Sequence, residues 1–371
     1  MTTIAIDIRM WKNSGIGTYL QNLVPPLIKR NPNCKFILYG DKNDLNNDKR
    51  INQNKNITLI DFTAPIYSIE EQIYFYKNIN KKISIFWSPH YNSPLFNNKL
   101  NKIVTLHDVY HLYNFKNLSL KQKMYAYLMI KLTIKKANKI LTVSHFSKNE
   151  IMKYCSVSTN KIKIIKNSIN HDTFKKITDI TSLKNTKKKF GIPENFILFV
   201  GNVKPNKNLI NLLKAINKIE NVNLVIAGKI DNFISNDYNN ISSYLINNKK
   251  VKNRVFFTSY VTNNEISHLY NLASLFVFPT LYEGFGIPPL EAMGCGCPTT
   301  VSRIPSLKET CGDATIYFDP NNIKELRSKI SKILHNKKLK EKMVRKGFEQ
   351  VKKFSWERSV ENLDKLIHKL L

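Results

Sequence analysis

Long apolar runs are absent from this chain of 371 residues. No stretch approaches the roughly 18 consecutive apolar residues that a membrane-spanning helix requires. The first ten residues, MTTIAIDIRM, lack the basic start and apolar centre of a signal peptide. We therefore expect a cytoplasmic protein, with peripheral contact to a membrane surface left open.

Cysteine is scarce and is not spaced for metal binding. The five cysteines are an odd number, and no Cys-x2-Cys pair occurs. Cys295 and Cys297 are separated by a single residue, which is a poor spacing for zinc. The eight histidines are scattered, and there is no Asp-x-Asp pair. These absences predict free thiols in a reducing compartment and a protein without a metal or other cofactor.

Acidic residues and arginine are also scarce. Asp and Glu number 27 against 58 Lys and Arg, which gives a formal net charge of +31, and arginine occurs at only eight positions. Such a charge is typical of proteins that bind nucleic acid or an anionic membrane. However, base-edge recognition usually relies on arginine, whereas lysine is enriched here together with Asn and Ile along the whole chain. We therefore attribute most of the charge to composition and expect no nucleic acid partner, while a weak attraction to anionic lipid remains open.

The sequence does contain enough apolar material for two domains. Hydrophobic residues make up 42% of the chain and aromatic residues 11%, which excludes a disordered protein, and the length exceeds that of one ordinary core. Short apolar runs alternate with amphipathic stretches, a pattern typical of parallel sheets covered by helices. We expect strands at 3–8, 35–39, 57–61, 83–87, 102–107 and 139–144, and again at 196–200, 222–227, 255–258, 275–278 and 315–318.

One amphipathic stretch, 119–136, has apolar side chains at helical spacing and lysine on the opposite face. The apolar positions include Met124, Tyr127, Leu128 and Leu132. This pattern predicts a helix that packs on the sheet with its apolar face and exposes its basic one.

The alternation is interrupted by a polar, lysine-rich segment, which we interpret as a linker at 173–190. It separates a first domain at 1–172 from a second at 191–354, and residues 355–371 form a further helical pattern. Two doubly wound α/β domains in tandem have a cleft between them and bind ligands at the carboxyl ends of their strands.

The most informative segment is 279–298, PTLYEGFGIPPLEAMGCGCP, which follows an apolar strand pattern. Gly284 and Gly286 allow backbone N–H groups to approach a ligand closely, and the helical pattern after them offers its positive amino terminus to an anion. Glu283 stands at that end, and Glu291 lies about two turns further along the same face. Carboxylates beside a phosphate site do not bind phosphate, so we expect both to accept hydrogen bonds from sugar or ribose hydroxyls.

This segment resembles the Glu-x7-Glu signature of glycosyltransferase family 4, the retaining GT-B enzymes. Tyr282 before the first Glu also matches, as do Gly-Phe-Gly-Ile-Pro after it and Glu-Ala-Met followed by Gly-Cys-Pro. The resemblance implies a GT-B fold of two Rossmann-like domains, with the C-terminal helix returning to the N-terminal domain. It also implies a catalytic role for Glu283 at the donor sugar, a ribose contact for Glu291, and donor binding by Gly284, Phe285 and Gly286.

Two further loops match the family. The turn with Gly15 and Gly17 resembles its N-terminal glycine-rich loop, a second anion-binding turn. The loop GNVKPNKN at 201–208 resembles the loop whose Lys holds the donor diphosphate. Lys207 matches that Lys and would act in catalysis, with Asn202 and Lys204 as further donor-binding residues. The family usually carries an Arg in this loop as well, whereas this chain has Asn202 and Asn206.

The first domain contains fewer matches. Thr105-Leu106-His107-Asp108 matches the His-Asp pair of the family. The match implies that His107 lines the donor-sugar pocket and that Asp108 contacts the acceptor. A purely structural role for a His at a strand end remains open. We expect Ser147 to act as the N-cap of the helix that follows.

The resemblance implies transfer of a hexose from a nucleotide sugar to a glycan or lipid-linked acceptor in polysaccharide biosynthesis, with retention of configuration. GDP-mannose is favoured as the donor, and UDP-glucose remains open. Lys207 and the amides of 284–286 would stabilise the departing diphosphate in place of a metal ion. Two alternatives remain open from the sequence: a nucleotide-sugar epimerase of the same fold, and a basic nucleic-acid-binding protein.

Overall fold

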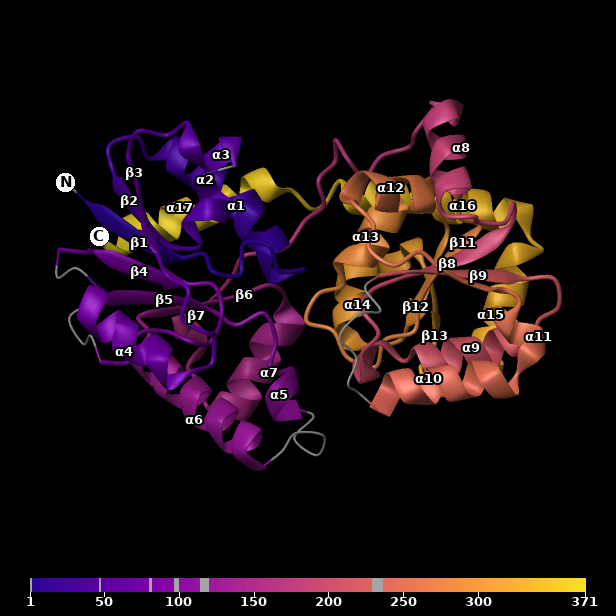
Figure 1. Ribbon diagram of the computed structural model, residues 1–371, viewed down its shortest axis with the longest axis horizontal. Coiled ribbons are helices and arrows are strands. Elements are labelled where there is room, and N and C mark those ends of the chain that lie inside the picture. The colour runs from indigo at the N-terminus through magenta and orange to yellow at the C-terminus, as the bar shows by residue number, and fades with distance from the viewer. Residues whose placement is uncertain (1, 47, 80–81, 97–99, 114–119, 229–235) are drawn as a thin grey trace. The chain divides into compact units, whose positions relative to one another are not determined.

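The computed structural model describes residues 2–46, 48–79, 82–96, 100–113, 120–228 and 236–371. The chain divides into two compact units. The first consists of Met1–Asn167 and Ser355–Leu371, and the second of Ser168–Phe354. Each unit is a parallel sheet with helices packed against it (Figure 1).

The sheet of the first unit has, within the described residues, seven parallel strands in the order β3-β2-β1-β4-β5-β6-β7. The expected strands of this half are all present, with ends shifted by at most two residues, while the short β7 was not expected. The strands are β1 (Thr3–Asp7), β2 (Lys35–Gly40), β3 (Ile57–Asp61), β4 (Ile85–Ser88), β5 (Asn101–Thr105), β6 (Lys139–Thr142) and β7 (Ile162–Ile164).

The helices of the first unit include one from the far end of the chain. They are α1 (Ile16–Arg30), α2 (Lys42–Asn46), α3 (Lys49–Asn52), α4 (Ile69–Asn78), α5 (Tyr110–Tyr113), α6 (Leu120–Lys136), α7 (His145–Cys155), the 3-10 turn η2 (Thr159–Lys161) and α17 (Trp356–Leu370). Helix α17 packs against α1, and Asn31 donates a hydrogen bond to Asp364 over 2.7 Å. Ser119, the expected first residue of the α6 helix, lies outside the described residues.

Helix α6 buries a different face from the one that its pattern predicts. Ile130 and Ile134 are buried, whereas Met124, Tyr127 and Leu128 are 69%, 43% and 53% exposed. The prediction that these three side chains face the sheet was therefore wrong. The helix carries a second apolar stripe, around Ile130 and Ile134, and this stripe joins the core that includes residues of β5, β6 and α7.

The second unit contains six parallel strands among its described residues, in the order β10-β9-β8-β11-β12-β13. All five expected strands are found, and β12 is an addition. The strands are β8 (Phe196–Val200), β9 (Asn223–Ala227), β10 (Val255–Phe257), β11 (Leu275–Phe278), β12 (Thr299–Ser302) and β13 (Ile316–Phe318).

Helices surround this second sheet as well. They are α8 (Ile180–Lys189), η3 (Pro205–Lys207), α9 (Leu209–Asn217), α10 (Asn236–Asn247), α11 (Lys249–Lys252), α12 (Asn263–Leu272), α13 (Ile287–Gly294), α14 (Pro305–Cys311), η4 (Gly312–Ala314), α15 (Ile323–Leu334) and α16 (Lys337–Val351). In the parts of both units that the structure describes, no helix is long and apolar enough to cross a bilayer.

The segment 173–190, expected as a linker, lies inside the second unit. Asp179 caps helix α8 by accepting a hydrogen bond from the Thr181 N–H (2.9 Å). Thr186 is hydrogen-bonded to His268 of α12 over 2.6 Å. The linker prediction is therefore corrected, because the polar composition of this segment belongs to an exposed helix that packs on α12. The chain passes between the units at 167–168 and 354–355.

Both sheets reverse their strand order at one place. Strand β1 lies between β2 and β4 in the first unit, and β8 lies between β9 and β11 in the second. Doubly wound sheets bind their ligands outside the carboxyl ends of the strands at this position. The loops after β1, β4 and β5, and those after β8 and β11, are therefore the candidate ligand-binding loops of the two units.

Candidate functional site

The loop after β11 leads directly into helix α13. Gly286 is the N-cap of α13 and has φ 91°, and a Cβ at this position would lie 2.4 Å from Leu307 Cδ2. Glycine is required here because other residues rarely adopt this backbone conformation. It allows the chain to turn from the loop that carries Glu283 into the helix that carries Glu291.

The loop after β8 is joined to the loop after β11 by backbone and amide contacts. The Asn206 carbonyl oxygen accepts hydrogen bonds from the Leu281 N–H and the Thr280 hydroxyl, each over 2.7 Å, and the Asn206 side chain donates to the Tyr282 carbonyl. Asn208, at φ 55°, donates to the Pro279 carbonyl oxygen over 3.1 Å. The two loops therefore form one structure, and Asn206, one of the two Asn residues in the loop where the family usually carries an Arg, is part of it.

Lys207 and Glu283, one from each loop, form an ion pair. Their side chains are 18% and 17% exposed, and the Lys207 ammonium nitrogen also lies 5.1 Å from the centre of the Phe278 ring. The structure thus brings together the two residues that the sequence predicts for the diphosphate and the donor sugar. A phosphate group that reaches Lys207 competes with Glu283 for its ammonium group.

The amino terminus of α13 offers fewer donors than the sequence pattern suggests. Pro288 and Pro289 occupy its first turn and carry no N–H. Backbone donors for an anion at this end can therefore come only from residues up to Ile287. These include the expected residues Gly284, Phe285 and Gly286.

Glu291 lies in the second turn of α13. The Tyr270 hydroxyl donates a hydrogen bond to Glu291 Oε2 over 3.2 Å. The residue is partly exposed, yet its carboxyl group is surrounded closely enough that burial raises its pKa to about 7, against the opposing effect of the Tyr270 hydrogen bond. Of the other expected donor residues in this unit, Asn202 is partly exposed and Lys204 is exposed.

In the first unit, His107 follows strand β5 and is held in one orientation. Its Nε2–H donates to the Pro89 carbonyl oxygen over 3.0 Å, which leaves Nδ1 as the acceptor of a neutral ring. The Tyr19 ring meets the imidazole edge-on, with centroids 4.9 Å apart. Burial lowers the pKa of His107 to about 4, so the ring is uncharged at neutral pH. Asp108, the next residue, accepts a hydrogen bond from the Tyr110 N–H (2.9 Å) at the start of α5.

The serine assignment at helix α7 is corrected. Ser144, not Ser147, is the N-cap, and its hydroxyl accepts a hydrogen bond from the Ser147 N–H over 2.9 Å. The Ser147 hydroxyl donates instead to the His107 carbonyl oxygen (3.0 Å). Ser147 therefore helps to fix the loop that carries His107.

The turn with Gly15 and Gly17 leads into helix α1. Gly15 has φ 77°, and a Cβ on Gly17 would lie 2.5 Å from the Trp11 carbonyl oxygen. The Gly17 N–H already donates to the Asn13 carbonyl oxygen over 2.8 Å. Close packing of the backbone thus explains why position 17 is a glycine. The amide of Gly17 is hydrogen-bonded within the turn.

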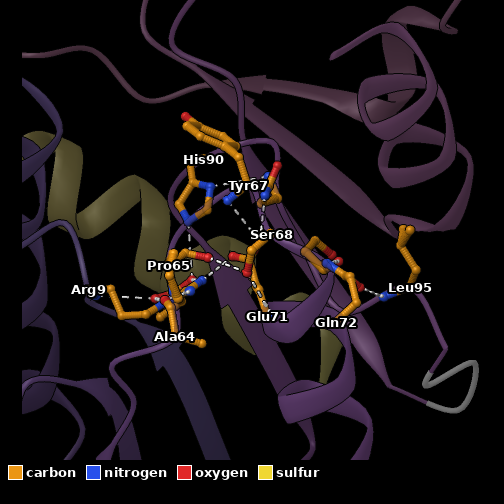
Figure 2. Close-up of polar contacts among 12 residues, drawn as sticks. Arg9, Ala64, Pro65, Tyr67, Ser68, Glu71, Gln72, His90 and Leu95 are labelled. Atoms are coloured by element: carbon orange, nitrogen blue, oxygen red, sulfur yellow. Dashed lines mark hydrogen bonds and ion pairs between the residues drawn. The ribbon is translucent and has the colours of Figure 1, made fainter. Parts of the chain in front are cut away.

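A buried ionic cluster at the ends of β1 and β4 was not foreseen from the sequence. Arg9 pairs with both Asp7 and Glu71, and His90 Nε2 lies 3.2 Å from Asp7 (Figure 2). All four side chains are at most 4% exposed. Although burial alone raises the pKa of Asp7, Arg9 and His90 hold it well below its usual value. Charged residues at the end of a buried strand, as at positions 7 and 9, were the available signal.

The same cluster has the composition of a metal site. Ligand atoms of Asp7, Glu71 and His90 lie within 4.8 Å of one another. The guanidinium of Arg9 lies between the two carboxylates and pairs with both. The positive charge at this position therefore comes from the chain itself, and a metal ion would have to displace Arg9.

Comparison with known proteins shows that two family models match this chain. The family model described as Glycosyltransferase Family 4 matches residues 13–173, and the one described as Glycosyl transferases group 1 matches residues 182–350. The second match contains the joined loops with Lys207 and Glu283. The two matches together cover most of both units.

The individual relatives that match the chain are also glycosyltransferases. The chain is 33% identical to O-antigen chain mannosyltransferase RfbU of Salmonella typhimurium over 258 residues, which cover 68% of this chain and 65% of that protein. It is 28% identical to serotype-specific mannosyltransferase WbdA of Escherichia coli over 227 residues, or 60% of this chain and 27% of that protein. The chain thus matches between about a quarter and two thirds of the length of these relatives.

The fold is similar to that of Anabaena Alr3699/HepE, solved in complex with UDP-glucose. The TM-score is 0.79 at 15% identity, and the match covers all of both chains. This similarity agrees with the GT-B fold that the sequence predicts. The two family models and the mannosyltransferase relatives show that the chain belongs to the glycosyltransferases of the family 4 type.

Proposed function

We propose that this protein is a retaining hexosyltransferase. It transfers a hexose from a nucleotide sugar to a glycan or lipid-linked acceptor in polysaccharide biosynthesis. The observation that carries the proposal is the Lys207–Glu283 pair beside helix α13, because it supplies one cation for a diphosphate and one carboxylate for a sugar. The mannosyltransferase names of the relatives favour GDP-mannose as the donor over UDP-glucose.

In this proposal the donor diphosphate lies between Lys207 and the amides up to Ile287. Its binding separates Lys207 from Glu283, whose oxygens then accept hydrogen bonds from the donor sugar. As the glycosidic bond breaks, negative charge grows on the diphosphate and is stabilised by Lys207, while the sugar becomes oxocarbenium-like. The acceptor hydroxyl attacks from the face of the leaving group and passes its proton to the departing diphosphate, so the configuration is retained. Glu291 accepts hydrogen bonds from the ribose.

We propose that polar groups of the first unit also act in this reaction. His107 is neutral and can accept a hydrogen bond at Nδ1, so we propose that it binds a hydroxyl of the donor sugar. Asp108 is proposed to contact the acceptor. No metal ion takes part in this scheme, since Lys207 and backbone amides supply the positive potential at the diphosphate.

Hydrolysis of nucleotide sugars without an acceptor tests the proposal most simply. The protein is incubated with GDP-mannose, UDP-glucose and UDP-N-acetylglucosamine, and release of nucleoside diphosphate is measured. We expect slow hydrolysis of GDP-mannose above all, with the released sugar first in its retained α-configuration by NMR. Release of an epimerised sugar would support the epimerase alternative. Steeply salt-dependent binding of nucleic acid, without nucleotide-sugar binding, would support the other alternative.

We also propose peripheral contact with an anionic membrane through the outer face of helix α6. This face consists of Met124, Tyr127, Leu128, Lys131 and Lys135, all exposed. Large apolar side chains that enter the headgroup region, flanked by lysines that meet anionic lipids, are typical of helices that lie on a membrane. Lys136 is not part of this face, because its ammonium group donates to the Leu95 carbonyl oxygen over 2.5 Å.

Co-sedimentation with vesicles of mixed neutral and anionic phospholipid tests this contact. Replacing Lys131 and Lys135 by Ala should weaken binding by roughly 1 kcal/mol per lysine. The matched control replaces Lys338 and Lys342, an exposed pair with the same spacing on α16. Equal sedimentation of the wild type and the α6 variant would contradict the membrane proposal.

A further inference from the structure

Three tyrosines form an aromatic cluster in the first unit. Tyr67 stacks on Tyr91 with ring centroids 5.0 Å apart and an angle of 21° between the planes. The Tyr125 ring meets Tyr67 edge-on at 6.5 Å. In spite of these contacts Tyr67 remains 42% exposed. Tyr67 is therefore the exposed ring of the cluster, and Tyr91 and Tyr125 are partly buried behind or beside it.

Tyr67 is presented by a strained backbone. Its φ of 70° lies in the left-handed region, which a bulky aromatic residue seldom adopts. The Tyr67 N–H donates to Glu71 Oε2 over 3.2 Å, and Arg9 donates to the Ala64 carbonyl oxygen, also over 3.2 Å. Conformations of this kind persist where the surroundings enforce them, and they cluster at ligand sites.

The buried ionic cluster holds the segment that carries Tyr67 in place. Figure 2 shows the segment with Ala64 and Tyr67 linked to Glu71 and Arg9 by dashed contacts. Asn92 extends the support, because its Nδ2 donates to Glu71 (2.6 Å) and to the Tyr125 hydroxyl (3.1 Å). One buried carboxylate, Glu71, thus contacts groups that fix both Tyr67 and Tyr125.

The negative charge near the tyrosines favours neutral ligands over anionic ones. Asp7 and Glu71 place two carboxylates against the single guanidinium of Arg9. Asp108 acts electrostatically on the Tyr67 hydroxyl, so its carboxylate adds to the negative potential there. A phosphate group is disfavoured in such a place. A neutral ring with hydroxyl groups fits, since its hydroxyls can donate to a carboxylate and its C–H face can lie on the aromatic rings.

We propose that Tyr67 and Tyr91 form a stacking surface for a pyranose ring of the carbohydrate acceptor, and that Asp108 accepts hydrogen bonds from the hydroxyls of that ring. This proposal rests on the proposed glycosyl transfer and assigns its acceptor subsite. Arg9 and Glu71 are positioning residues for this surface, because they hold the segment with Tyr67 and do not meet the sugar.

Saccharide binding in the absence of donor tests the subsite apart from the reaction. The probes are methyl α-D-mannopyranoside and α-mannobiose, titrated against the full chain and followed by NMR. Replacing Tyr67 by Ala should weaken their binding by about tenfold, whereas Tyr67→Phe, which keeps the ring, should bind within about threefold of the wild type. The control is Tyr76→Ala, a tyrosine of α4 in the same unit that is 66% exposed.

Acceptor-independent hydrolysis of GDP-mannose separates failure of the subsite from failure of the proposed function. The Tyr76→Ala control should hydrolyse the donor at the wild-type rate and melt at the wild-type temperature. Intact hydrolysis with equal saccharide affinity in the wild type and Tyr67→Ala would overturn the subsite, as would intact hydrolysis with no binding of either probe. Absence of hydrolysis in the wild type would count against the proposed function, while the Tyr67 comparison would still decide the subsite.

Discussion

The ammonium group of Lys207 is paired with the carboxylate of Glu283, although 76 positions separate the two residues in the chain. The loops that carry them are joined through Asn206 and Asn208, so the pair is part of a fixed structure. In the proposed reaction, a donor diphosphate next to Lys207 would separate this pair and make Glu283 available to the sugar.

Replacing Lys207 by Ala should lower turnover by about a hundredfold, because the diphosphate then leaves without its main cation in a site with little water. Steady-state hydrolysis of GDP-mannose measures the effect. Lys214→Ala, an exposed lysine on helix α9 of the same unit, is the matched control and should keep the wild-type rate. An equal loss of turnover in both variants would mean that the overall charge of the protein, and not the position of Lys207, causes the effect.

Donor affinity should rise with pH through about 7, the value to which burial raises the pKa of Glu291. The ionised carboxylate is the form that accepts hydrogen bonds from the ribose hydroxyls. At pH 6 only about a tenth of the free protein has Glu291 ionised. Binding should therefore be about tenfold weaker at pH 6 than above pH 8. Isothermal titration with GDP measures the profile. Glu291→Gln should bind GDP more weakly and without this pH dependence. A profile with the same slope in that variant would assign the titration to another group.

The same raised pKa affects stability with a defined sign. The protonated Glu291 favours the folded state, and this contribution is present below the ordinary pKa of 4.5. It is lost as the pH rises through about 7. The free energy of unfolding of wild type relative to Glu291→Gln should therefore decrease between pH 5 and pH 8.

Activity should persist in excess EDTA, since Lys207 and backbone amides provide the charge at the diphosphate. The cluster of Asp7, Glu71 and His90 makes this test sharper, because Arg9 already occupies the space between its carboxylates. Hydrolysis of GDP-mannose is compared with EDTA alone and with added Mg²⁺ or Mn²⁺. Complete loss in EDTA, restored by either ion, would contradict the metal-free scheme.

Replacing Arg9 by Ala should destabilise the first unit by about 3–5 kcal/mol, because it leaves Asp7 and Glu71 buried without their cation. Chemical denaturation followed by circular dichroism measures the change. Lys12→Ala, which removes an exposed lysine paired with Asp44, should leave the transition unchanged. If both variants unfold like the wild type, the cluster does not carry the stability assigned to it.

The sequence is most informative where function depends on local backbone chemistry. The glycines of the loop after β11, the carboxylates on both sides of them and the Lys-bearing loop after β8 are short motifs, and each can be recognised from neighbouring residues. The position of each loop follows from the alternation of strands and helices. The sequence alone therefore predicts that Lys207 and Glu283 lie in one site, and the structure shows their ion pair.

Features that depend on tertiary packing were not predicted. Strand β12 is fully buried but reads TTVS, so it has no apolar run to mark it. Its polarity is compensated by hydrogen bonds such as Thr300 Oγ1 to the Ile316 carbonyl oxygen, at 2.8 Å, which only the fold can supply. The exposed face of α6 was misassigned because the helix has two apolar stripes, and neighbouring elements decide which of them is buried.

The ionic cluster illustrates the same limit. Asp7 and Arg9 are close in sequence, but Glu71 and His90 come from a helix and a loop more than 60 residues away, and spacing alone does not link them. The stacked tyrosines on that cluster were missed for the same reason. Long-range assembly at the carboxyl ends of parallel strands is the part of the site that the structure adds.

The turnover of Glu283→Gln with GDP-mannose, measured as release of GDP, tests the central claim most directly. The amide keeps the size of the side chain but removes the charge that pairs with Lys207 and accepts strong hydrogen bonds from the donor sugar. We predict a loss of about a hundredfold in turnover, with the melting temperature of the wild type. A folded Glu283→Gln protein that releases GDP at the wild-type rate would contradict the assignment of this loop as the donor site.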